Sequence, residues 1–132
     1  MKSVDRVLLV ASVALFPVSA IAQDATLPPH FELRQQDLFR AGRTLTNAIA
    51  DFDNDGDLDL FVGFNGHPNR LYRNDGGIFT DVAEQVGIAD NDVTRTAAWG
   101  DYNNDGHLDL YVAFVSREGS WNRLYRNEGN GK

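Results

Sequence analysis

Residues 51–59 read DFDNDGDLD, and the same pattern returns at residues 101–109 as DYNNDGHLD. Acidic or amide side chains stand at alternate positions of both stretches, except for His107 at position seven of the second, and a glycine stands at the sixth position of each. The five acids of the first stretch repel one another strongly unless a cation lies among them. Hard oxygen ligands on alternate residues, folded around a glycine, suit Ca²⁺. We therefore predict two calcium-binding loops and expect the rest of the chain to be their scaffold.

Each loop offers a ligand set, in which positions one, three, five and nine supply side-chain oxygens and position seven supplies a backbone carbonyl. The first set is Asp51, Asp53, Asp55, Asp59 and the carbonyl of Asp57; the second is Asp101, Asn103, Asp105, Asp109 and the carbonyl of His107. The first loop has the larger number of carboxylate ligands, and ligand charge tunes affinity, so it should bind Ca²⁺ more tightly. An EF-hand would need an acid at position twelve, where Val62 and Val112 stand instead.

The segments that flank the loops also repeat. Residues 58–64 (LDLFVGF) match residues 108–114 (LDLYVAF), and residues 69–74 (NRLYRN) return at residues 122–127. With a strand before each loop and another at residues 78–83, a unit of about fifty residues holds four short strands, which is typical of a β-propeller blade. We predict an all-β propeller with about two four-stranded blades in a repeat region at residues 31–132, with blade cores near 44–83 and 94–129. A β-sandwich would not repeat a loop and a strand at one period.

The ends of the repeat region suggest an incomplete ring. Residues 31–38 resemble a fourth strand without its first three, and the second unit stops at residue 132, where its own fourth strand is expected. Propellers have roughly four to eight blades, so two units cannot close a ring. We expect either the front piece of a longer protein or a chain that needs further blades or self-assembly.

Residues 1–22 have the layout of a secretory signal peptide. Lys2 and Arg6 precede an apolar run, and Ala20 and Ala22 supply a cleavage site before Gln23. A membrane anchor is the alternative, but the apolar run is too short to span a bilayer. We predict cleavage, a linker at residues 23–30, no stable membrane span afterwards, and a secreted, periplasmic or cell-surface location.

Composition excludes several classes of protein. The formal charge of −7 argues against nucleic acid as a partner, although most of the acids lie in the two loops. The chain has no cysteine, which removes disulfides and zinc–thiolate sites. No nucleophile–base pair, phosphate-binding loop or zinc triad is present, so we predict no catalytic residues. His67 is interpreted as a solvated turn residue, Trp99 as blade core and Trp121 as an exposed loop residue, while the arginines of the NRLYRN motifs should pair with neighbouring acids.

These motifs resemble the calcium-binding FG-GAP repeat, also called the VCBS repeat, of integrin-α-type propellers. The nearer resemblance is to secreted bacterial proteins and cartilage acidic protein relatives that join such repeats to an ASPIC/UnbV-type domain. The resemblance implies a propeller of usually seven blades, with Ca²⁺ in hairpin loops on one face. The liganding positions it implies are Asp51, Asp53, Asp55, Asp59, Asp101, Asn103, Asp105 and Asp109. The Phe-Gly dipeptide of the family is Ile49-Ala50 in one copy and Trp99-Gly100 in the other.

The function that these observations favour is binding or adhesion to protein or carbohydrate, with two structural Ca²⁺ ions and no enzymatic activity. Two alternatives remain open at this point. The chain could be part of a secreted propeller enzyme, such as a polysaccharide lyase, with its catalytic residues elsewhere. It could also be a purely structural repeat of a large adhesin.

Overall fold

The computed structural model describes residues 30–115 and 121–129. The predicted signal peptide at residues 1–22 and the linker up to residue 29 lie outside the described residues. Compactness divides the chain into Met1–Glu32 and Leu33–Lys132, and the fold described below belongs to the second unit. Its described residues form strands, turns and loops without a helix, which confirms the predicted all-β class. No segment of the described chain forms a helix that could cross a membrane.

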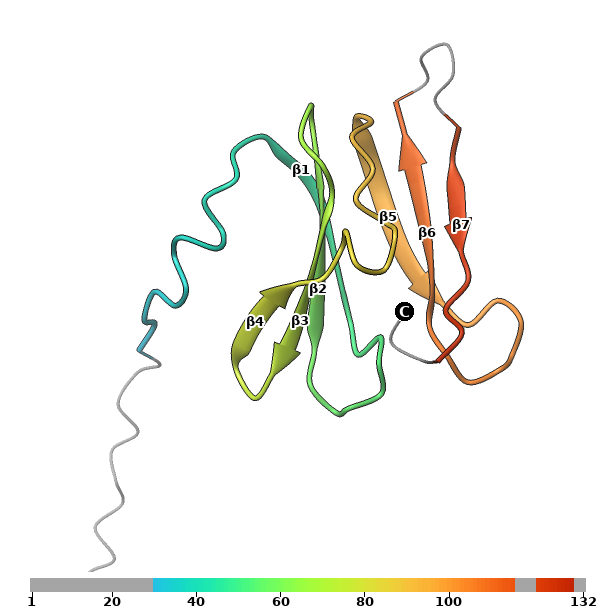
Figure 1. The fold of residues 1–132 in the computed structure, drawn as a ribbon, viewed down its shortest axis with the longest axis horizontal. Coiled ribbons are helices and arrows are strands. Elements are labelled where there is room, and N and C mark those ends of the chain that lie inside the picture. The colour runs from blue at the N-terminus through green and yellow to red at the C-terminus, as the bar shows by residue number, and fades with distance from the viewer. Residues whose placement is uncertain (1–29, 116–120, 130–132) are drawn as a thin grey trace, which may run out of the picture. The chain divides into compact units, whose positions relative to one another are not determined.

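The strands form two antiparallel sheets (Figure 1). The first sheet is a meander of β1 (Thr44–Ala50), β2 (Asp59–Phe64), β3 (Arg70–Asp75) and β4 (Ile78–Asp81). The second contains β5 (Thr94–Gly100), β6 (Asp109–Phe114) and β7 (Arg123–Tyr125). The sequence predicted that the second unit reaches residue 132 at the place of its fourth strand, and the described residues supply the three strands before it.

The two sheets repeat one another in register as well as in sequence. The first strand of each pairs with the second so that Ala50 opposes Asp59 and Gly100 opposes Asp109. A register shift occurs at the same place in both, after Thr44 and after Thr94. The predicted period of about fifty residues therefore describes two copies of one blade.

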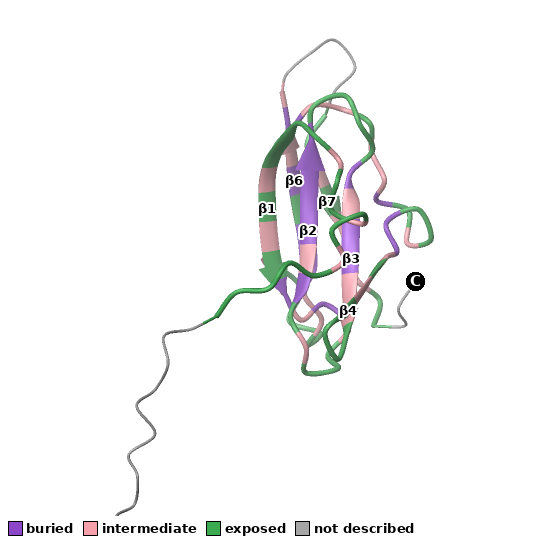
Figure 2. Ribbon diagram, turned by 90° about the vertical axis from the view of Figure 1, so that its left-hand side faces the viewer, coloured by how far each residue is buried: buried purple, intermediate pink, exposed green. Residues whose placement is uncertain are grey.

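The main core lies between the two sheets. Because side chains alternate across a strand, Phe61 of β2 and Leu71 of β3 point to the face that packs against the second sheet. The second sheet contributes Leu110, Val112 and Phe114 of β6 to the same core. The chain that connects the sheets adds Val82, Ala83 and Ile88 to the same cluster. Figure 2 shows that β2 is buried along most of its length.

The opposite face of the first sheet carries a smaller core of Val62, Phe64 and Tyr72. It is covered by the segment before β1, where Leu38 and Ala41 pack against it. The sequence predicted a strand at residues 31–38, and this prediction was wrong. The described residues 30–43 form no strand, and a turn runs through residues 35–39 instead. The segment buries part of Leu38 and Ala41 by folding over the face of the sheet, whereas a strand would pair along its edge.

Hydrogen bonds and an ion pair connect the two blades to the chain between them. Asn69 lies buried at the start of the third strand, where its side-chain oxygen accepts a hydrogen bond from the Thr94 hydroxyl at 2.7 Å. The Asn69 backbone N–H donates to the Asp90 carbonyl at 2.8 Å. Tyr125 and Arg123 of β7 contact the Asp90 carboxylate. These contacts tie the connecting chain to both blades.

The two sheets are in tight contact at Gly63. A Cβ placed there would lie 2.4 Å from Cγ2 of Thr94, a buried side chain that has no room to retreat. The equivalent residue in the second blade is Ala113, which is partly exposed because no sheet covers it in the described structure. A methyl group is therefore excluded at one copy of the position and tolerated at the other.

We expect Gly63→Ala to lower the free energy of unfolding by about 1–3 kcal/mol, the usual cost of overpacking a core. The matched control is Ala113→Val, which enlarges the equivalent side chain and should change stability by less than about 0.5 kcal/mol. Urea unfolding followed by circular dichroism measures both. Equal effects at the two positions would contradict the packing described here.

Candidate metal centre

The two acidic loops have the same backbone conformation. Asn54 and Gly56 adopt φ angles of 59° and 96°, and Asn104 and Gly106 adopt 58° and 88°. Asn and Gly are the residue types that reach this left-handed region most readily. In each loop the first aspartate accepts two backbone N–H groups: Asp51 from Asp55 and Gly56, and Asp101 from Asp105 and Gly106.

The last aspartate of each loop is buried and fastens the loop to the sheet. Asp59 is 1% exposed and accepts the N–H of Phe52 at 2.9 Å and the N–H of Asn74 at 2.8 Å, one on each carboxylate oxygen. Asp109 repeats this arrangement with Tyr102 at 3.1 Å and Asn127 at 2.8 Å. The carboxylate thus joins the start of the loop to the third strand of its blade.

The first loop gathers three carboxylates. One oxygen each from Asp51, Asp53 and Asp59 lies within 4.8 Å of the other two. Asp53 Oδ1 is buried and has no hydrogen-bond partner. Such an orphaned oxygen is uncommon, because buried polar atoms normally find a partner or an ion. Asp55, which was also predicted to be a ligand, lies outside this triad, and its Oδ1 accepts the N–H of Asp57 at 2.8 Å.

The environment of the first loop disfavours the charged forms of two of its carboxylates. Burial raises the pKa of Asp53 above its ordinary value, and the neighbouring charge of Asp55 adds to the rise. Burial also raises the pKa of Asp59, although the N–H groups of Asn74 and Phe52 partly offset it. A bound cation would remove this penalty by favouring the charged forms.

The second loop is arranged differently around its third position. Asn103 donates its side-chain amide to Asp105 Oδ2 at 2.7 Å. The hydrogen bond from the backbone N–H of His107 is the main reason that the pKa of Asp105 lies below its ordinary value, and the hydrogen bond from the Asn103 amide is the second. Across residues 30–115 and 121–129, a cluster of three acidic side chains at metal-binding spacing occurs in the first loop alone. The imidazole of His107 lies 3.3 Å from the side-chain nitrogen of Asn54, so the two loops are neighbours.

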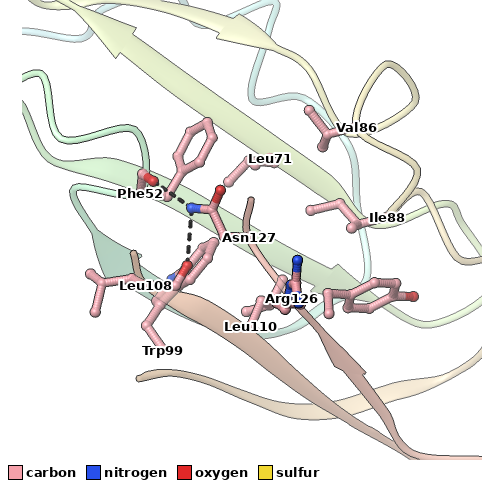
Figure 3. Close-up of a pocket in the computed structure, with 10 residues that line it drawn as sticks. Phe52, Leu71, Val86, Ile88, Trp99, Leu108, Leu110, Arg126 and Asn127 are labelled. Atoms are coloured by element: carbon pink, nitrogen blue, oxygen red, sulfur yellow. Dashed lines mark hydrogen bonds between the residues drawn. The ribbon is translucent and has the colours of Figure 1, made fainter. Parts of the chain in front are cut away.

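An asparagine that the sequence analysis did not single out links the two loops. The side chain of Asn127 donates to the carbonyls of Phe52 in the first loop, at 2.7 Å, and of Leu108 in the second loop, at 3.2 Å (Figure 3). Asn127 lines a pocket between the blades, together with Leu71, Ile88 and Trp99 among others (Figure 3). The recurrence of Asn at the end of both NRLYRN motifs was the signal that could have identified it. The side chain of Asn74 stays within its own blade, where it donates to the Leu58 carbonyl at 3.1 Å and accepts the Gly77 N–H at 2.8 Å.

The remaining candidates behave as the sequence suggested. The motif arginines pair with acids: Arg70 with Asp81 at 3.6 Å, Arg73 with Asp75 at 2.9 Å, Arg123 with Asp90 and Asp92, and Arg126 with Glu128 at 2.7 Å. His67 lies in an exposed turn against the ring of Phe64. Trp121 is exposed, and Trp99 packs against the main core, where it stacks on Phe52.

The comparisons with known proteins agree with this geometry. The sequence model described as FG-GAP-like repeat matches residues 51–112, which run from the first acidic loop to the strand after the second. This chain is an FG-GAP-like repeat protein. The search of curated proteins returned no match. The two sheets are consequently FG-GAP blades of the propeller type, and the matched segment contains both acidic loops.

The buried aspartate of an FG-GAP loop should stabilise the blade even without a metal. In Asp109→Asn one carboxylate oxygen becomes an NH₂ group. This group cannot accept a hydrogen bond from the backbone N–H of Tyr102 or of Asn127, whichever donor faces it. We expect a loss of about 1–3 kcal/mol in excess EDTA, the cost of leaving a buried donor unpaired. The matched control is Asp105→Asn, an exposed change in the same loop that should alter stability by less than about 0.5 kcal/mol. Equal denaturation midpoints for both variants and the parent chain would contradict the role of Asp109.

Proposed function

We propose that this chain is an exported, calcium-stabilised FG-GAP module whose role is binding rather than catalysis. The observation that carries the calcium part is the convergence of Asp51, Asp53 and Asp59 around a buried oxygen with no partner. Ca²⁺ favours six to eight oxygen ligands supplied by carboxylates, backbone carbonyls and water. The donor set of the first loop fits that chemistry, and Asp55 and the carbonyl of Asp57 are the further ligands we propose for it.

The proposed metal is structural. Bound Ca²⁺ would neutralise the crowded carboxylates of the first loop and supply folding free energy that the loop lacks by itself. The second loop is proposed to bind Ca²⁺ more weakly, because Asn103 takes the place of a carboxylate at position three. The side chain of Asn127 spans both loops, so a cation in one of them would also affect the join between the blades.

The binding role is supported by what the described chain contains and by its family. Its buried loop aspartates, Asp59 and Asp109, accept backbone hydrogen bonds, and the arginines of β3 and β7 form ion pairs with neighbouring acids. FG-GAP-like repeats form propeller-type modules, a fold that presents loops on a common surface. We propose a protein or carbohydrate partner at the cell surface.

A reciprocal exchange at position three tests the metal sites. Asp53→Asn should weaken binding at the first loop, and Asn103→Asp should strengthen it at the second, each by roughly tenfold because ligand charge tunes affinity. Isothermal titration with CaCl₂, after removal of metal by EDTA, measures both constants.

Thermal melting supplies the second readout for the same variants. Ca²⁺ should raise the melting temperature of the parent chain, and Asp53→Asn should reduce that rise. Asp37→Asn, an exposed carboxylate outside both loops, is the control and should leave the calcium response unchanged. Melting curves of the parent chain that coincide with and without EDTA would overturn the calcium proposal.

Export is tested separately. Expression of the whole chain in a secreting host should yield a mature protein that begins at Gln23, since the pattern before it predicts cleavage after Ala22. Intact-mass spectrometry of the culture medium or periplasm measures this. Recovery of the chain in the cytoplasm with Met1 retained would contradict export.

A further inference from the structure

The two acidic loops are joined through Phe52, the second residue of the first loop. Its backbone N–H donates to Asp59 Oδ2 at 2.9 Å, so its position depends on the buried carboxylate that fastens the loop. Its carbonyl accepts a hydrogen bond from the Asn127 side chain at 2.7 Å (Figure 3). Its ring is 7% exposed and stacks on Trp99, just before the second loop, with the ring centroids 6.1 Å apart. Phe52 thus contacts the first loop and the residues that hold the second.

Asn127 continues this path into the second loop. Its side-chain NH₂ group has two hydrogens and donates to two carbonyls, those of Phe52 and Leu108. Its backbone N–H donates to Asp109 Oδ1 at 2.8 Å. A chain of hydrogen bonds therefore runs from the buried aspartate of one loop to that of the other. Because both hydrogens of the amide are engaged, a shift of either carbonyl would break a bond to Asn127.

We propose that Asn127 couples the two loops, so that a cation bound in the first raises the affinity of the second for another cation. This coupling rests on the proposed calcium function, and it makes one cooperative unit of two separate sites. A cation in the first loop would fix Asp59, and through it the Phe52 carbonyl, in the position that Asn127 requires. The second loop would then lose less conformational freedom when it binds its own ion. By linkage, an ion in the second loop strengthens binding at the first by the same factor.

The equivalent asparagine of the first blade provides a matched control. Asn74 also ends an NRLYRN motif, and its side chain donates to the Leu58 carbonyl as that of Asn127 donates to the Leu108 carbonyl. The bond from Asn127 to Phe52 is additional and joins the two blades. Substitution of Asn74 therefore removes the same kind of bond within a blade and leaves the link between the loops in place.

The coupling is measured by comparing the second loop while the first is filled and while it is empty. In the parent chain, the weaker step of an isothermal titration with CaCl₂ reports the second loop with the first one filled. Asp53→Ala with Asp55→Ala, which removes two proposed ligands, reports it with the first one empty. The two states are matched in charge, because five acids with Ca²⁺ and three acids without it both leave −3 on the first loop.

We expect the second loop to bind Ca²⁺ about fivefold more tightly when the first is filled, the lower end of typical coupling between sites. Asn127→Ala should reduce this ratio to less than about twofold, because the link between the loops is lost. Asn74→Ala should leave the ratio at its parent value. Circular dichroism before and after addition of CaCl₂ checks that each variant is folded.

The outcomes separate the coupling from the proposed calcium function. A parent chain that binds no Ca²⁺ would overturn both, and one that binds a single Ca²⁺ would overturn the coupling alone. Equal second-loop affinity in the parent and in the Asp53→Ala, Asp55→Ala variant would also overturn the coupling, and this comparison stands even if Asn127→Ala fails to fold. A ratio that survives Asn127→Ala would overturn the role of Asn127 and would indicate the exposed contact of Asn54 with His107 instead.

Discussion

A buried carboxylate at the end of each acidic loop holds the blade together. The two oxygens of Asp59 accept N–H groups from the start of the loop and from the third strand, and Asp109 does the same fifty residues later. A charged acceptor is suited to this position because hydrogen bonds to ionised groups are stronger than neutral ones. The other acids of the loop depend on this bond, since it fixes the direction in which the loop leaves β1 and returns to β2.

The first sheet is covered on both of its faces. The second sheet packs against one face, and residues 35–41 lie over the other, where Leu38 and Ala41 contact the cluster of Val62, Phe64 and Tyr72. Burial of these apolar side chains stabilises the first blade.

Much of the candidate site could be predicted from sequence because its determinants are local. The alternating acids, the glycine at position six and the strand that follows lie within a dozen residues, and both loops fold as this pattern indicates. Residues 31–38 were predicted wrongly as a strand, because an apolar spacing that matches residues 79–86 does not reveal whether a pairing edge is available. Asn127 was overlooked because its partner Phe52 lies far away in sequence, at 75 residues' separation.

The sequence by itself determined the repeat, the strands of both blades, the glycine turn of each acidic loop and the family, since these depend on residue order and local backbone preference. Only the tertiary structure decided which carboxylates converge: it gathers Asp51, Asp53 and Asp59 and leaves Asp55 aside. It also decided that Gly63 is needed where the first sheet meets Thr94, whereas its equivalent, Ala113, is tolerated. The physical reason is that two blades of nearly identical sequence have different neighbours, and burial, charge and steric fit depend on the neighbour.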